Sequence, residues 1–242
     1  MKDLFALRTS PLFWCLVLVL STIIHSHAAE EDLYDFLWLD PDKKVYVLQN
    51  KVYKKKRKTY ADIGYIMGIN NAYQDTTGGK FNVGHYLTEE WAIEGTFSSY
   101  SNQDNDNYNN LNRINGSVPF VRRSKSLMGI NAVWSPFYGK INTFNKIIYF
   151  DWSFGLGLGQ LEYESNKDTV SNAAAADNYT TEKTTAIITK TNVKVHATKN
   201  VHIGIEYGRT NFQATGPTIN NIQGSTSWKA QTEVVFSIGF SF

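Results

Sequence analysis

The sequence predicts an all-β fold, an eight-stranded antiparallel transmembrane β-barrel that follows a short periplasmic helix and hairpin. Three observations support this prediction. Apolar and small polar residues alternate with a two-residue period in about eight stretches, the connections are alternately short and long, and the chain ends on alternating aromatic residues.

Residues 1–28 have the pattern of a secretory signal peptide. A basic head is followed by an apolar run over residues 12–20 and by small residues that lead to Ala28, after which we expect cleavage. The apolar run is shorter than the roughly 20 residues of a membrane-spanning helix. The only cysteine, Cys15, lies inside this run, so the mature chain is expected to hold no disulfide.

Residues 29–58 are predicted to form a periplasmic N-terminal segment, and residues 59–242 the barrel. The segment begins with a short amphipathic helix around Leu33, and a small hairpin that pairs Val45 with Val52 follows it. Its basic run is interpreted as a charged collar beside the membrane, with binding of an acidic partner or lipid headgroups as the alternative.

Each predicted strand has a bulky apolar face and a small polar face. In the first strand, Ile63 and Tyr65 share the apolar face, while Asp62 and Gly64 lie on the other. A small, glycine-rich face suits the lumen of a narrow barrel whose bulky face meets lipid. A soluble sandwich stays the alternative, because alternation alone does not separate inside from outside. The strands are predicted at residues 61–70, 81–87, 91–98, 128–134, 150–159, 187–195, 201–208 and 233–242.

The connections between the predicted strands fall into two sets that alternate along the chain. Long polar loops are expected on the extracellular side, and short turns with both chain ends on the periplasmic side. The short or compact links lie near residues 88–89, 134–147 and 198–200, and the longer ones at 71–79, 101–123, 164–183 and 211–227.

The charge balance and the motifs exclude several kinds of site. A formal net charge of +2 suggests no nucleic-acid partner. Asp104 and Asp106 are spaced like calcium ligands, but the loop lacks the glycine and the terminal acid of a calcium-binding loop. We therefore predict neither a metal site nor a cofactor.

The chain resembles a family of small outer-membrane β-barrel domain proteins of predatory and related Gram-negative bacteria. The resemblance implies an eight-stranded barrel similar in size to the OmpA transmembrane domain, without an appended peptidoglycan-binding domain. It implies a location in the outer membrane and says little about activity. The segments that resemble the family are VYVLQNKVYKKKRKTYADIGYIMG, VWSPFYGKINTFNKIIYFDWSFGLGLG and the terminal FSIGFSF.

The polar faces of the strands give the candidate site. The interior of an eight-stranded barrel is only wide enough for side chains to fill, and buried charges are costly unless they pair. We therefore expect a cross-lumen ion-pair network that blocks the bore. Its predicted members are Asp62, Glu94, Asp151, Lys190, Lys194, Glu206, Lys229 and Glu233.

Three partners are expected. Phe240 and Phe242 resemble the terminal signal that barrel-assembly machinery reads. Outer-membrane lipid is expected around the barrel. The bulky outward Trp134, Trp152 and Phe154 suggest a homo-oligomer with lipid between its protomers.

These features favour a structural or interaction barrel with a closed lumen. A small porin or channel is the alternative, and a lipid-modifying enzyme is the second alternative. The predicted topology places His85, His196 and His202 toward the periplasmic side, away from the outer leaflet, and no G-x-S-x-G elbow is present. We assign no catalytic residue and expect no enzymatic activity.

Overall fold

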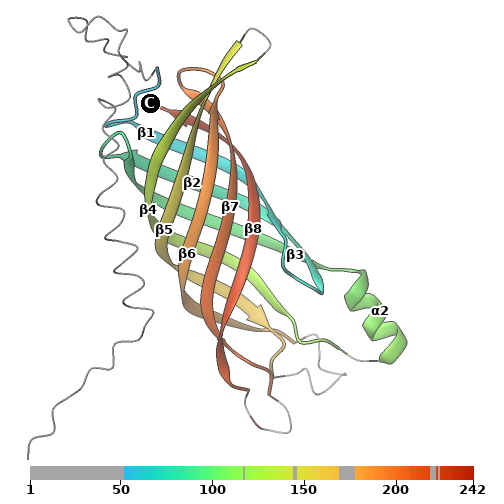
Figure 1. Ribbon diagram of the computed structural model, residues 1–242. Helices are drawn as coiled ribbons and strands as arrows, with labels where there is room; N and C mark the ends of the chain where they lie inside the picture. Colours follow the sequence, from blue (N-terminus) through green and yellow to red (C-terminus); the bar gives the residue numbers. More distant parts are fainter. Residues whose placement is uncertain (1–51, 117, 144–145, 169–177, 219–221, 223) are drawn as a thin grey trace, which may run out of the picture. The chain divides into compact units, whose positions relative to one another are not determined.

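The computed structural model describes residues 52–116, 118–143, 146–168, 178–218, 222 and 224–242 (Figure 1). The predicted signal peptide lies outside the described residues, as do the predicted N-terminal helix and nearly all of the predicted hairpin. Lys51–Phe242 forms one compact unit.

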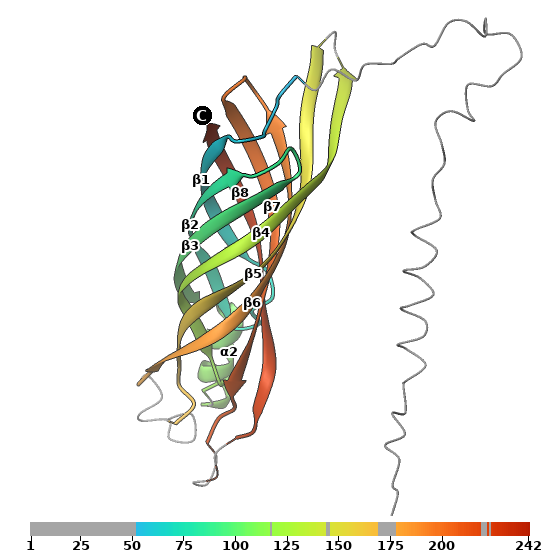
Figure 2. The same cartoon turned by 90° about the vertical axis from the view of Figure 1, so that its left-hand side faces the viewer.

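Eight antiparallel strands close into a single barrel, as predicted (Figures 1 and 2). Each strand pairs with its neighbour in the sequence, and β1 pairs with β8, for example through Ile63 opposite Ile238. The strands are β1 (Thr59–Gly68), β2 (Gln74–Tyr86), β3 (Trp91–Asp104), β4 (Arg122–Thr143), β5 (Lys146–Ser165), β6 (Thr180–His196), β7 (Val201–Thr215) and β8 (Thr226–Ser241).

Alternation along the strands separates the two faces of the barrel wall. On β7, His202, Gly204 and Glu206 are buried, whereas Ile203 and Ile205 are more than half exposed. The polar set therefore points into the lumen and the apolar set points outward. This arrangement is the reverse of a soluble sandwich, which buries its apolar faces.

The short and long connections gather at opposite ends of the barrel. The short connections at residues 87–90 and 197–200 lie at the end that holds the start of β1 and the C-terminus, here called the terminal end (Figure 2). The end of β4 and the start of β5 also lie there. The long ones include the β3–β4 connection, which contains helix α2 (Asp106–Asn115), and they lie at the other end, here called the α2 end.

Most strands are longer than the alternation predicts. The link predicted at 134–147 is instead a continuation of β4 and β5, whose ladder extends to Thr143 opposite Lys146. A register shift between Trp134 and Phe137 interrupts the alternation, which is why the sequence pattern appears to end there. The resulting hairpin projects beyond the barrel at the terminal end (Figure 2).

Helix α2 was not expected within the predicted loop at 101–123. Asn105 caps its start, because the Asn105 side chain accepts hydrogen bonds from the backbone amides of Asn107 and Tyr108. Gly116, with a φ of 60°, ends it in the left-handed conformation that glycine adopts easily. None of the helices among the described residues has the length and apolar character needed to cross a membrane.

Candidate functional site

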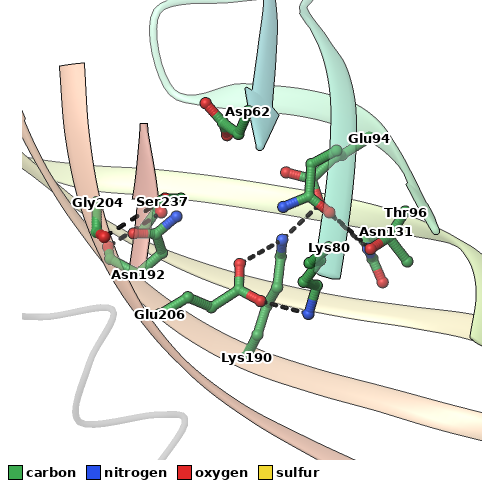
Figure 3. A network of polar contacts seen from close by, with 12 residues as sticks. Asp62, Lys80, Glu94, Thr96, Asn131, Lys190, Asn192, Gly204, Glu206 and Ser237 are labelled. Atoms are coloured by element: carbon green, nitrogen blue, oxygen red, sulfur yellow. Dashed lines mark hydrogen bonds and ion pairs between the residues drawn. The ribbon is translucent and has the colours of Figure 1, made fainter. Parts of the chain in front are cut away.

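Charged side chains from β2, β3, β6, β7 and β8 meet in the middle of the lumen and form the ion-pair layer: Lys80, Glu94, Lys190, Glu206 and Glu233. Figure 3 shows the first four of them. Lys80 Nζ lies 2.6 Å from Glu206 Oε1 and 2.9 Å from Glu233 Oε1. Lys190 Nζ lies 2.9 Å from Glu206 Oε2 and also contacts Glu94. All five residues are buried, and each charged group contacts at least one group of opposite charge where water is scarce.

Neutral side chains donate further hydrogen bonds to the carboxylates of Glu94 and Glu233. Tyr60 Oη donates to Glu94 Oε2 at 2.8 Å, and Asn131 Nδ2 donates to Glu94 Oε1 at 3.3 Å. Tyr100 Oη donates to Glu233 Oε2 at 2.9 Å. Buried hydrogen bonds of this kind limit motion, and this network joins strands from opposite sides of the barrel. Asn131 Oδ1 is buried without a hydrogen-bond partner among the described residues.

A second cluster lies nearer the terminal end and is centred on Asp62. Its two oxygens contact Lys194 Nζ and His202 Nε2, each at 2.6 Å. Gly239 faces this cluster, and a Cβ at that position would collide with Asp62 and His202. The close approach of these side chains therefore requires glycine at this point of β8.

The chain segment before β1 contributes a third cluster. Lys55 Nζ lies 2.7 Å from Asp151 Oδ1, and His196 Nε2 lies 2.7 Å from Asp151 Oδ2. The backbone amides of Lys55 and Lys56 donate to the Glu89 carboxylate. Residues 52–58 thus cross the terminal end from β5, where Tyr53 contacts Tyr149, to β2, where the Arg57 amide donates to the Tyr86 carbonyl. The segment inserts the Lys55 side chain into the lumen.

An apolar layer separates the ion-pair layer from the α2 end. Its members face the lumen, and half of them also have an apolar neighbour on the outer face. Alternation is lost where both faces are apolar. The other members alternate with polar residues, so the polar side chains lie outside and the apolar ones inside, the reverse of the predicted pattern. The layer contains Ile66, Tyr100, Leu127, Leu161, Tyr163, Ala186, Ile188, Phe212, Ala214 and Val235.

At the α2 end the lumen opens into a polar cavity of about 270 Å³. Arg122 and Lys229 are its cationic lining residues, and Asn70, Asn102 and Gln231 contribute amides. No carboxylate belongs to its lining, all of which lies in the described part of the chain.

The structure brings seven of the eight predicted network residues into the three clusters: Asp62, Glu94, Asp151, Lys190, Lys194, Glu206 and Glu233. Lys229 is the exception. It is exposed, lines the cavity, and makes no ion pair within the described residues. The physical reason is its position near the start of β8, opposite Phe212, where the lumen opens to water and no acid faces it.

Two lysines of these clusters are not among the predicted residues. Lys80 precedes the predicted second strand and follows two glycines, so the sequence pattern places it beside a loop. Lys55 belongs to a basic run interpreted as a solvated collar, yet it is buried. Lys80 could have been found by extending the inward parity of Asn82 and Gly84 back along β2, whereas nothing in the sequence distinguishes Lys55 from its neighbours.

The described histidines lie in different surroundings. Asp62, His202 and Ser241 lie in the order acid, base, hydroxyl, but Ser241 Oγ is 3.4 Å from His202 Nδ1, beyond the usual reach of an activated nucleophile. His202 is buried and Asp62 is shared with Lys194. His85 is exposed and contacts Thr59 Oγ1 at 3.0 Å. No group of three potential metal ligands occurs within the described ranges.

Comparison with known proteins gives structural likenesses at low identity. No protein-family model and no curated protein matches the chain, so the resemblance to barrels of predatory bacteria stays a prediction. The N-terminal β-barrel domain of Pseudomonas aeruginosa OprF matches 77% of this chain and 98% of its own, with 11% identity and a TM-score of 0.46. Ail of Yersinia pestis matches 77% and 99%, with 12% identity and a TM-score of 0.40. Neisserial surface protein A matches 76% and 96%, with 10% identity and a TM-score of 0.44.

Proposed function

We propose that this chain is an outer-membrane barrel of a Gram-negative bacterium with a closed lumen and a structural or interaction role. The observation that carries the proposal is the outward apolar surface around a charged, filled interior. Every strand contributes large exposed apolar side chains to this surface, which suits lipid and not water. One example from each strand in order is Ile63, Phe81, Ile93, Ile130, Leu156, Val193, Ile205 and Ile238.

Aromatic side chains on the outer surface support the same orientation. Trp91 and Trp134 stack with ring centroids 6.0 Å apart, and Phe137 lies 5.7 Å from Trp152. This group lies toward the terminal end, where an aromatic girdle would meet the lipid headgroups. The short turns and both ends of the barrel would then be periplasmic, and the long connections and α2 extracellular.

Conductance tests the closed lumen. The three clusters and the apolar layer fill the bore between the terminal end and the cavity, so purified protein in planar bilayers is expected to give no stable single-channel steps. A general porin prepared in the same detergent is the positive control. Ohmic steps that persist as purity increases would reject the closed lumen and favour the porin alternative.

Loss of the C-terminal aromatic ring is expected to reduce assembly of the barrel in the outer membrane. Phe242 exchanges backbone hydrogen bonds with Thr59 at 3.0 and 2.9 Å, so deleting it would remove both the ring and the last pairing of the barrel seam. Phe242→Ala removes only the ring and is expected to lower the amount of barrel in the outer membrane. Phe236→Ala, an outward aromatic on the same strand, is the control. Equal levels of the two variants would argue against a terminal signal.

Self-association is a second part of the proposal. Trp134, Trp152 and Phe154 form one outward cluster, with 5.4 Å between the last two rings. Such a surface can bury apolar area against a second copy with lipid between the protomers. Native mass measurement in mild detergents and in nanodiscs is the test, and a monomer in all of them would remove this part.

A further inference from the structure

The polar cavity at the α2 end of the lumen has the character of a ligand site. We propose that it binds a small soluble oxyanion, a molecule that carries a carboxylate, phosphate or sulfate group. This goes beyond the closed-lumen role. The cavity lies between the apolar layer and the α2 end, so a ligand can reach it without passing through the barrel.

The charge of the cavity favours an anion. Arg122 and Lys229 line it, and neither makes an ion pair among the described residues, although the Glu182 carboxylate attracts Arg122 from a longer distance. Two acids near this end of the strands are already matched. Asp104 accepts two hydrogen bonds from Arg123, at 2.8 and 3.0 Å, and Glu182 contacts Lys167.

Two buried donors in the cavity wall lack acceptors. Arg122 Nη2 donates to the Thr215 carbonyl at 2.9 Å, but Arg122 Nε has no partner in the described part of the chain. Gln231 Oε1 accepts from Ser124 Oγ, which leaves Gln231 Nε2 without a partner there. Buried donors are rarely left unsatisfied, and ionised oxygen acceptors form the strongest bonds to guanidinium groups.

The wall of the cavity is held in place by other hydrogen bonds. Asn70 Nδ2 donates to the Ala230 carbonyl at 2.8 Å, and Asn102 Nδ2 donates to the Ser124 carbonyl at 2.7 Å. The Arg122 guanidinium lies 5.1 Å from the centre of the Phe120 ring and 5.3 Å from that of Tyr163. A cation that contacts two rings and amides that are hydrogen-bonded to the backbone lose little freedom on binding.

The size and position of the cavity specify the ligand further. Its volume of about 270 Å³ lies just below the roughly 300–1,000 Å³ of small-molecule pockets, so the ligand is small. Its strand residues face the lumen and not the outer surface of the barrel. A lipid headgroup would have to reach over the rim, which favours a soluble molecule.

Isothermal titration calorimetry of the full-length mature protein in a nonionic detergent tests the proposal. The probes are inorganic phosphate, glucose 6-phosphate and glucose at low ionic strength, because salt screens such contacts. Arg122→Gln combined with Lys229→Gln removes both charges. Lys125→Gln, on the same strand but half exposed and paired with Glu164, is the matched control. Thermal unfolding shows whether each variant is folded.

We expect at least one phosphate-bearing probe to bind and glucose not to bind. The double variant is expected to lose about tenfold or more in affinity, because each charge-assisted bond is strong, whereas Lys125→Gln stays within about twofold. Lipopolysaccharide in nanodiscs is a further probe, and its binding in preference to glucose 6-phosphate would overturn the soluble ligand. Equal binding of glucose, unchanged affinity in the folded double variant, or no binding of either phosphate probe would overturn the oxyanion site. None of these outcomes bears on conductance, so the closed lumen is tested separately.

Discussion

The middle of the lumen and its cavity at the α2 end use the same kinds of cationic side chain in opposite ways. In the ion-pair layer, Lys80 and Lys190 each contact two carboxylates. In the cavity, Arg122 and Lys229 make no ion pair with any described residue. A buried charge must be matched by the protein, whereas water can solvate a charge at an open end. The middle is therefore committed to holding the barrel together, and the cavity keeps its cations available for a ligand.

The largest expected effect comes from breaking the ion-pair layer. Lys190→Gln keeps a polar side chain of similar shape but leaves Glu94 and Glu206 each without one cationic partner. We expect the free energy of unfolding to fall by about 3–5 kcal/mol, the usual cost of an uncompensated buried charge. Denaturant unfolding in liposomes, followed by tryptophan fluorescence, measures it.

Lys183→Gln is the matched control for this substitution. Lys183 lies on the same strand, but its side chain is 60% exposed and pairs with Glu162 at 3.2 Å. An exposed pair contributes about 1 kcal/mol or less. If the free energy of unfolding falls by the same amount in both variants, burial in the lumen does not strengthen the ion pairs of Lys190.

The second-largest loss of unfolding free energy is expected in the apolar layer, which lies between the ion-pair layer and the cavity. Leu127 is fully buried and faces the lumen, so Leu127→Ala leaves a cavity and is expected to cost about 2–5 kcal/mol. Leu158→Ala on the outer face is the control, because lipid can fill the space that it leaves. A larger loss for Leu158→Ala than for Leu127→Ala, measured by the same unfolding experiment, would contradict an apolar layer inside the lumen.

The sequence predicts the barrel well because strand alternation is local. Asp62 and Glu206 point inward by parity alone, and no knowledge of the register is needed for that. Which charges meet is a different matter, since Lys80 and Glu206 are 126 residues apart and come together only through closure of the ring. Ile66 was missed because Tyr65 and Met67 beside it are also apolar, so no contrast marks the inner face.

A smaller effect is expected where residues 52–58 enter the terminal end. Lys55→Gln removes one partner of Asp151 but leaves His196 in place. The expected cost is about 1–3 kcal/mol, that of a buried acceptor with incomplete hydrogen bonding. Hydrogen exchange of the backbone amides of residues 52–58 should accelerate, and the exposed Lys54→Gln should leave it unchanged. Equal exchange in both variants would mean that Lys55 does not hold the segment.

The smallest expected effect comes from the same change, lysine to glutamine, at Lys229 in the cavity. It is the direct counterpart of Lys190→Gln in the middle of the lumen. Lys229 also belongs to a strand of the barrel wall and lines the lumen, but it is exposed and lies opposite Phe212. Lys229→Gln removes a solvated charge without stranding a carboxylate, so unfolding should change by no more than about 0.5 kcal/mol. A loss as large as that of Lys190→Gln would mean that Lys229 has an acidic partner after all. The cavity would then resemble the ion-pair layer, and Arg122 would be its one cation without an ion pair among the described residues.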